Sequence, residues 1–165
     1  MKKKLIALVI GVVACVCALA GCGATEKTFE KAGMRITLTS AFYEQEHIAQ
    51  TATYVSSSAI VVATKESFTL LAGLEDYTLE DYTDLTISAN NLTSDKNYRE
   101  NKDYIYFTYE RVVDGKDFFY LATTHKSSDA FWLIQFACNV SDKESKTETF
   151  LKWADTITFV TEATV

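Results

Sequence analysis

Apolar and polar residues alternate along short stretches of the N-terminal half of the chain, a pattern that predicts half-buried strands. Met34 to Thr39 alternate throughout, and Thr51–Val55 and Ala59–Ala63 flank three serines that predict a hairpin turn. The next stretch, Lys65–Leu74, fits either a buried turn or a short helix. We therefore expect three strands here and leave the last stretch open.

The strongest pattern lies in the second half of the chain, where three apolar stretches predict an antiparallel meander. They cover residues 103–113, 117–125 and 130–140. Asp114-Gly115 predicts a turn between the first two stretches, and Ser127-Ser128 predicts the second turn.

The first hairpin of this meander can close in two registers. A two-residue loop places Tyr109 opposite Tyr120, whereas a three-residue loop, Asp114–Lys116, puts Tyr109 on the same face as Phe119 and Leu121. A slip of one residue moves every side chain of a strand to the other face. We favour the three-residue loop because it builds one continuous apolar face that also includes Ile105, Phe107, Trp132, Ile134 and Phe136.

Helical spacing of apolar residues predicts a first helix over residues 78–89. Thr78 and Asp81 resemble a capping box at its N-terminus, with Asp in place of the usual Glu or Gln. Asn90-Asn91 predicts its end. The apolar face of this helix is predicted from spacings of three and four residues, at Leu79, Tyr82, Leu85 and Ala89.

A second helix is predicted over residues 141–155, where Ser141 and Glu144 suggest another capping box. Its inward residues are Phe150, Leu151 and Ala154, and Trp153 is expected to cover an edge. Residues 156–160 read as a closing strand. The order β-β-β-α-β-β-β-α plus this strand predicts an α+β fold, an antiparallel β-sheet covered by helices.

The N-terminus carries the pattern of an export signal. Lys2, Lys3 and Lys4 precede Leu5–Ala20, an uncharged apolar run of sixteen residues. This run is shorter than the ~20 residues that span a membrane. The tetrapeptide ending in Cys22, Leu-Ala-Gly-Cys, resembles the lipobox of bacterial lipoproteins. The alternative is an ordinary signal peptide with an incidental cysteine.

The lipobox resemblance implies diacylglyceryl transfer to the Cys22 thiol and cleavage between Gly21 and Cys22. The chain then divides into a signal peptide (residues 1–21), a lipidated tether (residues 22–33) and one globular domain (residues 34–165). Each buried lipid methylene contributes about 0.8 kcal/mol, so two acyl chains anchor firmly. Eleven tether residues reach at most about 40 Å. We therefore expect a domain close to the extracytoplasmic surface of a cell membrane.

Cleavage also changes the charge and the cysteine count. Loss of three lysines lowers the basic residues from 16 to 13 against 22 acidic ones, so the formal charge falls from −6 to −9. No basic stripe remains, and nucleic acid is not an expected partner. Cys15 and Cys17 leave with the signal, so Cys138 has no disulfide partner within the mature chain.

Several local sequences together resemble the PsbP-like superfamily, and most closely its bacterial lipoproteins. The resemblance implies an antiparallel sheet covered by helices, and binding or assembly roles without a single shared function. A proline often follows the first strand in such proteins, where this chain has Thr39-Ser40-Ala41. The matching stretches are Gly33–Leu38 leading to Phe42, Leu79–Tyr82, Phe131–Phe136 and Phe150–Ile157.

Candidate catalytic and metal-binding residues are few. His47 and His125 are the imidazoles of the chain, there is no Gly-x-Ser-x-Gly motif, and Cys138 alternates with core residues. We expect no enzyme activity and no cofactor. Weak metal candidates are Glu44, Glu46 and His47, for which a solvated loop is the simpler interpretation.

The second face of the meander is the remaining candidate for binding. In the favoured register it carries Tyr104, Tyr106, Phe118 and Tyr120, and it is either covered by other elements or open to a partner. The first hypothesis is a membrane-anchored, non-catalytic binding or assembly module that contacts a protein or surface polymer. The second is a solute- or metal-binding lipoprotein, and the third is a hydrolase with a site formed only in three dimensions.

Overall fold

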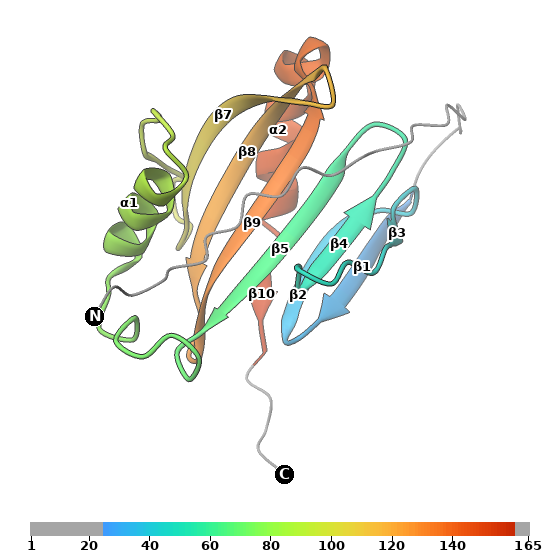
Figure 1. The fold of residues 1–165 in the computed structure, drawn as a ribbon. Coiled ribbons are helices and arrows are strands. Elements are labelled where there is room, and N and C mark those ends of the chain that lie inside the picture. The colour runs from blue at the N-terminus through green and yellow to red at the C-terminus, as the bar shows by residue number, and fades with distance from the viewer. Residues whose placement is uncertain (1–24, 161–165) are drawn as a thin grey trace.

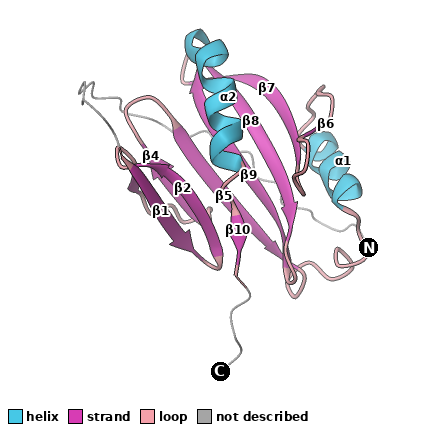
Figure 2. Cartoon of the chain, turned by 180° about the vertical axis from the view of Figure 1, so that it is seen from behind, coloured by secondary structure: helices cyan, strands magenta, loops and turns pink. Residues whose placement is uncertain are grey.

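A computed structural model describes residues 25–160 and shows a large antiparallel sheet with a layer on each face (Figure 1). Helix α2 and a small three-stranded sheet lie on one face, and helix α1 lies on the other, near the β7 edge (Figure 2). The predicted α+β class with an antiparallel sheet is confirmed. No helix in the described range is long and apolar enough to cross a membrane.

The large sheet has the strand order β3-β4-β5-β9-β8-β7-β6. The predicted hairpin around Ser56–Ser58 is present, where the Ser56 hydroxyl donates to the Ala59 carbonyl at 3.0 Å. The strand after this turn continues to Ser67, which resolves the first part of the ambiguous stretch. The strands are β3 (Tyr43–Glu44), β4 (Ala52–Val55), β5 (Ile60–Ser67), β6 (Asn97–Tyr98), β7 (Ile105–Val113), β8 (Lys116–Lys126) and β9 (Ala130–Asn139).

The small sheet contains a strand that the sequence pattern did not predict. β1 (Glu26–Lys31) pairs along its whole length with β2 (Met34–Thr39), and β10 (Thr158–Phe159) pairs with the other side of β2. Residues 26–33 are therefore not a tether, and the ordered domain begins eight residues earlier than predicted. The apolar–polar pattern did not predict this strand because Phe29 is its one buried residue and most of the others are polar.

The hairpin between β7 and β8 has the register that was not favoured. Val113 pairs with Lys116 and Tyr109 pairs with Tyr120, so the loop has two residues. Asp114 and Gly115 have φ values of 50° and 75°, the left-handed geometry of the tight turns that match the twist of paired strands. The favoured three-residue loop is therefore wrong: turn geometry decides the register, and both sheet faces turn out to be apolar.

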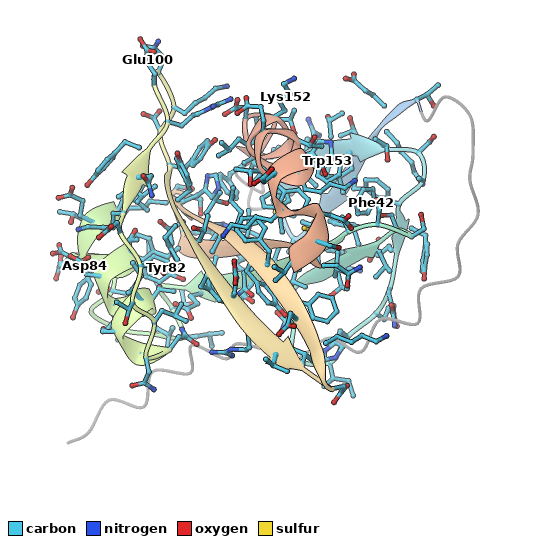
Figure 3. All side chains as sticks on the ribbon, turned by 90° about the horizontal axis from the view of Figure 1, so that it is seen from above. Phe42, Tyr82, Asp84, Glu100, Lys152 and Trp153 are labelled. Atoms are coloured by element: carbon cyan, nitrogen blue, oxygen red, sulfur yellow. The ribbon has the colours of Figure 1, made fainter. Side chains whose placement is uncertain are left out.

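Helix α1 (Leu79–Ala89) begins with the predicted capping box, in which the Thr78 hydroxyl accepts from the Asp81 amide at 3.1 Å. Its inner face differs from the prediction, because Ala89 is exposed and two threonines are buried. The Thr83 hydroxyl lies 2.6 Å from the Thr124 hydroxyl of β8. Threonine can face the sheet here because its hydroxyl finds a partner there. Figure 3 shows Tyr82 on the inner side of this helix and Asp84 on its outer side.

Helix α2 (Lys143–Ala154) buries Phe150, Leu151 and Ala154, as predicted. The predicted capping box at Ser141 is absent, because a 3₁₀ turn (Val140–Asp142) precedes the helix and Asp142 occupies the N-cap position without a side-chain bond. Trp153 packs edge-on against Phe42 at a ring distance of 5.2 Å (Figure 3). This contact joins α2 to the end of β2 and closes the main core.

Candidate functional site

The four aromatic residues predicted to share one binding face lie on opposite faces of the sheet. Tyr104 and Tyr106 pack with the core beneath α2, whereas Phe118 and Tyr120 belong to the cluster on the α1 side. The predicted binding face is therefore wrong, because it rested on the three-residue register. Tyr104 is 4% exposed, and the Tyr120 ring stacks on Tyr109 at 4.8 Å.

The weak metal candidates share a cavity without forming a metal centre. Glu44, Glu46 and His47 line a surface cavity of about 420 Å³ beside β3 and the loop that follows it. The Glu44 carboxylate lies 2.6 Å from the Lys31 ammonium. Within residues 25–160, no group of three His, Cys, Asp or Glu side chains is placed to hold a metal ion.

Cys22 and the signal-cleavage position between Gly21 and Cys22 lie outside the described residues. Cys138 is buried in the α2-side core, as its alternation predicted. Burial raises the pKa of its thiol to about 11, so the thiol keeps its proton near neutral pH. A protonated thiol is a weak nucleophile.

A second cavity, of about 390 Å³, opens where α2 ends. Residues of the loop before β7, of the end of β8 and of strand β10 line it. Of the residues weighed from the sequence as binding or catalytic candidates, Tyr104 and His125 line it. Its lining consists of Asn101, Lys102, Asp103, Tyr104, His125, Lys126, Ala154, Asp155, Ile157, Thr158 and Phe159.

Polar contacts around Asp155 fix one wall of this cavity. The Tyr104 hydroxyl donates to Asp155 Oδ1 at 2.8 Å, and Arg99 Nη2 donates to Asp155 Oδ2 at 3.1 Å. Arg99 also contacts Glu148 at 2.9 Å, and Lys102 Nζ donates to the Asp155 carbonyl at 3.1 Å. Burial and the nearby carboxylate raise the pKa of Tyr104, so its hydroxyl remains a donor. Both Asp155 oxygens are thus engaged.

His125 is a buried polar residue in the lining of the cavity. The residue is 5% exposed, and its ring lies 5.2 Å from the Tyr104 ring and 5.5 Å from the Phe159 ring. Nε2 lies 2.9 Å from the Thr123 hydroxyl. Burial lowers the pKa of His125 to about 3, so the imidazole is neutral at physiological pH.

A buried carboxylate lies on the opposite face of the sheet, beneath α1. Glu66 of β5 is 8% exposed, and it accepts a hydrogen bond from the Tyr82 hydroxyl. The Tyr82 ring stacks on Phe131 at 4.3 Å. Burial raises the pKa of Glu66, which favours its protonated form. The sequence did not single out Glu66, because it lies in the stretch Lys65–Leu74, whose secondary structure was left open.

The sequence named Tyr104 and His125 but did not bring them together. Arg99 and Asp155 were missed, because they are 56 residues apart and meet only when α2 folds back over the sheet. One signal was available: His125 alternates with Leu121 and Thr123 and so belongs on their inward face. Asp155 carried no comparable signal.

No protein-family model and no curated protein sequence matches this chain. Solved structures do resemble it. Cyanobacterial PsbP from Synechocystis sp. PCC 6803 aligns with a TM-score of 0.62 at 10% identity, covering 88% of this chain and 99% of that chain. The Ran-binding protein Mog1p from Saccharomyces cerevisiae aligns with a TM-score of 0.56 at 8% identity, covering 84% of this chain and 97% of that chain. The chain therefore has the PsbP-like fold.

Proposed function

We propose that this protein is an extracytoplasmic lipoprotein, held to a membrane through Cys22, that works as a non-catalytic binding or assembly module. The observation that carries the binding role is the cavity beside Tyr104 and His125. It is open at the surface, the Asp155 contacts join its walls, and β10 pairs with β2 beside it. A preformed concave site with few polar groups is typical of binding proteins.

The geometry of the N-terminal strand supports a short connection to the anchor. The Thr25 carbonyl accepts from the Ser40 amide at 2.6 Å, and β1 starts at Glu26. Thr25 lies three residue steps after Cys22, a span of at most about 10 Å. An acylated Cys22 would hold the domain close to the membrane surface, because this connection is shorter than the expected tether of eleven residues.

The states of Cys138 and His125 support a role without covalent catalysis. The thiol is protonated and packed in the core, and the imidazole is neutral, with its Nε2 2.9 Å from the Thr123 hydroxyl of the same strand. Nucleophilic catalysis needs a nucleophile beside a base, and these two side chains do not supply that pair to the cavity. The Ran-binding neighbour shows that this fold can serve protein binding, which is an analogy of fold.

Membrane anchoring is tested with Cys22→Ser in the full chain. We expect the wild type in the membrane fraction at the mature mass plus lipid, and the variant unprocessed and without lipid. A Cys138→Ser variant is the matched control and should fractionate like the wild type. A Cys22→Ser chain of mature size that stays in the membrane fraction would refute the lipoprotein assignment.

Binding at the cavity is tested by cross-linking in intact cells. Lys102 lies at the cavity rim and Lys116 at the distant β7–β8 turn, and both are exposed. We expect Lys102→Trp to abolish a specific cross-link that Lys116→Trp retains, at equal thermal stability. Equal cross-linking by both variants would place the binding surface elsewhere.

A solute-binding role is the second candidate, favoured by the size of the same cavity. Its volume of about 390 Å³ lies within the ~300–1,000 Å³ typical of small-molecule sites. Thermal unfolding of the lipidated chain in the presence of small solutes separates this role from a purely macromolecular one, because a bound solute raises the midpoint.

A further inference from the structure

A row of apolar side chains crosses the large sheet on the side of α1. Each residue of the row pairs directly with the next, and each is at most 9% exposed. Antiparallel sheets usually present polar residues on a face that meets water, so an apolar row predicts a covering layer. The row runs from β4 to β7 and consists of Val55, Ile60, Ala137, Tyr120 and Tyr109.

Helix α1 covers a different part of this face. It contacts β8 where the Thr83 hydroxyl lies 2.6 Å from the Thr124 hydroxyl, and Thr124 is four residues, or about 13 Å, along β8 from Tyr120. Ile87 of α1 and Leu92 after it pack against the apolar cluster from the side of β7. The helix therefore shields the β7 end of the row and not the end at β4 (Figure 1).

The β4 end of the row is buried without such a cover. Val55, Ile60 and Ala137 are 8%, 5% and 6% exposed. Within residues 25–160, no helix or strand lies in front of β4, β5 and the adjoining part of β9, because α2 and the small sheet occupy the opposite face (Figure 1, Figure 2). Short side chains on an uncovered sheet face remain in contact with water, so their low exposure points to a cover from outside this range.

The N-terminal part of the chain has the length and the composition to supply that cover. It joins the domain at Thr25, whose carbonyl accepts from the Ser40 amide. Three residues after Ser40, Tyr43 pairs with Val55 of the row. Four residues separate the uncharged apolar run Leu5–Ala20 from Thr25, so a run of sixteen residues can reach across the row. Residues 161–165 follow β10, which lies on the opposite face (Figure 2).

We propose that the apolar run Leu5–Ala20 packs on this row in the unprocessed chain, and that cleavage after Gly21 uncovers the row on the mature protein. Burial of apolar surface favours this packing. The positive charge of Lys2, Lys3 and Lys4 also favours it, because the mature chain has 13 basic against 22 acidic residues. The apolar face thus becomes available for contacts only after processing. This inference rests on the proposed processing at Cys22 and goes beyond binding at the cavity.

Thiol labelling of Ala137→Cys tests the cover directly, because position 137 lies in the row and natural Cys138, the next residue, is buried on the opposite face. The full chain is synthesised without membranes, so that it stays unprocessed, and is compared with a chain that starts at residue 22. The described strands begin at Glu26, so the truncation removes none of them. We expect removal of residues 1–21 to raise the ratio of the maleimide labelling rate at position 137 to that at Cys138 at least tenfold. An unchanged ratio would overturn the proposal.

Two double variants of the full chain separate specific packing from a general effect of the additional residues. Val12→Asp with Val13→Asp places charges in the apolar run and should raise the labelling ratio as the truncation does. Val12→Leu with Val13→Leu keeps the run apolar and should leave the ratio at the value of the full chain. Equal ratios for the two double variants would contradict the proposed packing.

The concentration dependence of labelling detects a different occupant of the row. If position 137 stays protected in the truncated chain and the protection grows with protein concentration, a second copy covers the row and the proposal is overturned. An unchanged labelling ratio for a protein whose Cys22 carries lipid in cells would overturn this inference and leave the lipoprotein assignment standing.

Discussion

Acid sensitivity of the fold should depend on His125. Its pKa is about 3 in the folded protein, whereas an unfolded histidine titrates near 6.5. Because the folded pKa is lowered, the unfolded state binds the proton first as the pH falls. The stability that neutral His125 contributes is therefore fully present above pH 6.5 and is lost as the pH falls toward 3. At about 1.4 kcal/mol per pH unit, the full loss is about 5 kcal/mol.

That loss is large compared with the 5–15 kcal/mol that stabilises a typical domain. Replacement of His125 by Phe keeps a ring against Tyr104 and Phe159, and Thr123 retains its bond to Ile134. We therefore expect His125→Phe to remove this part of the acid dependence. As the pH falls from 6.5 to 4, the free energy of unfolding of the variant should rise by about 3 kcal/mol relative to that of the wild type.

Urea unfolding followed by far-ultraviolet circular dichroism measures this difference at each pH. Carboxylates also titrate in this range, so the comparison is made between variants and not within the wild type. His47→Phe is the matched control, because His47 is exposed on a loop. Its free energy of unfolding should depend on pH in the same way as that of the wild type. A His125→Phe curve that also runs parallel to the wild type would show that His125 is not buried as a neutral ring.

Two further predictions concern stability. Glu66→Gln should be more stable than the wild type near pH 8 by about 1 kcal/mol, because an ionised carboxylate is costly to bury, Gln carries no charge, and Glu66 Oε2 has no hydrogen-bond partner among residues 25–160. The raised pKa of Glu66 means that wild-type stability is full below the unfolded value of about 4.3 and falls as the pH rises, so urea midpoints of the two proteins should converge near pH 4. Gly115→Ala should cost about 1 kcal/mol in urea unfolding, since Gly115 has a φ of 75° and open space around it, and Gly115→Asn should cost less. Equal midpoints for Gly115→Ala and the wild type would contradict the observed two-residue turn.

Periodic apolar patterns predicted most of the elements because local burial determines them. β2 and the two helices follow this rule, and the capping box at Thr78 needs only residues three apart. β1 was not predicted because it is an edge strand that buries one side chain, Phe29, so its sequence looks like a polar linker.

The register of the β7–β8 hairpin could not be derived from the pattern, since both faces of these strands are apolar. The sequence could not predict the cavity either, because Arg99, His125 and Asp155 come from three separate parts of the chain. Arg99 meets Asp155 only when α2 folds back over the sheet, and no local sequence signal specifies that geometry.

A molecule bound at this cavity while the protein is on the membrane would support the proposed function most directly. A photo-reactive amino acid placed at Asp103, on the cavity rim, reports what lies within reach in intact cells, and the same group at Lys116 is the distant control. We predict a discrete cross-linked species in the membrane fraction from position 103 that is absent from position 116. Identical products from both positions, or none from either, would contradict the proposal that this protein is a membrane-anchored binding module.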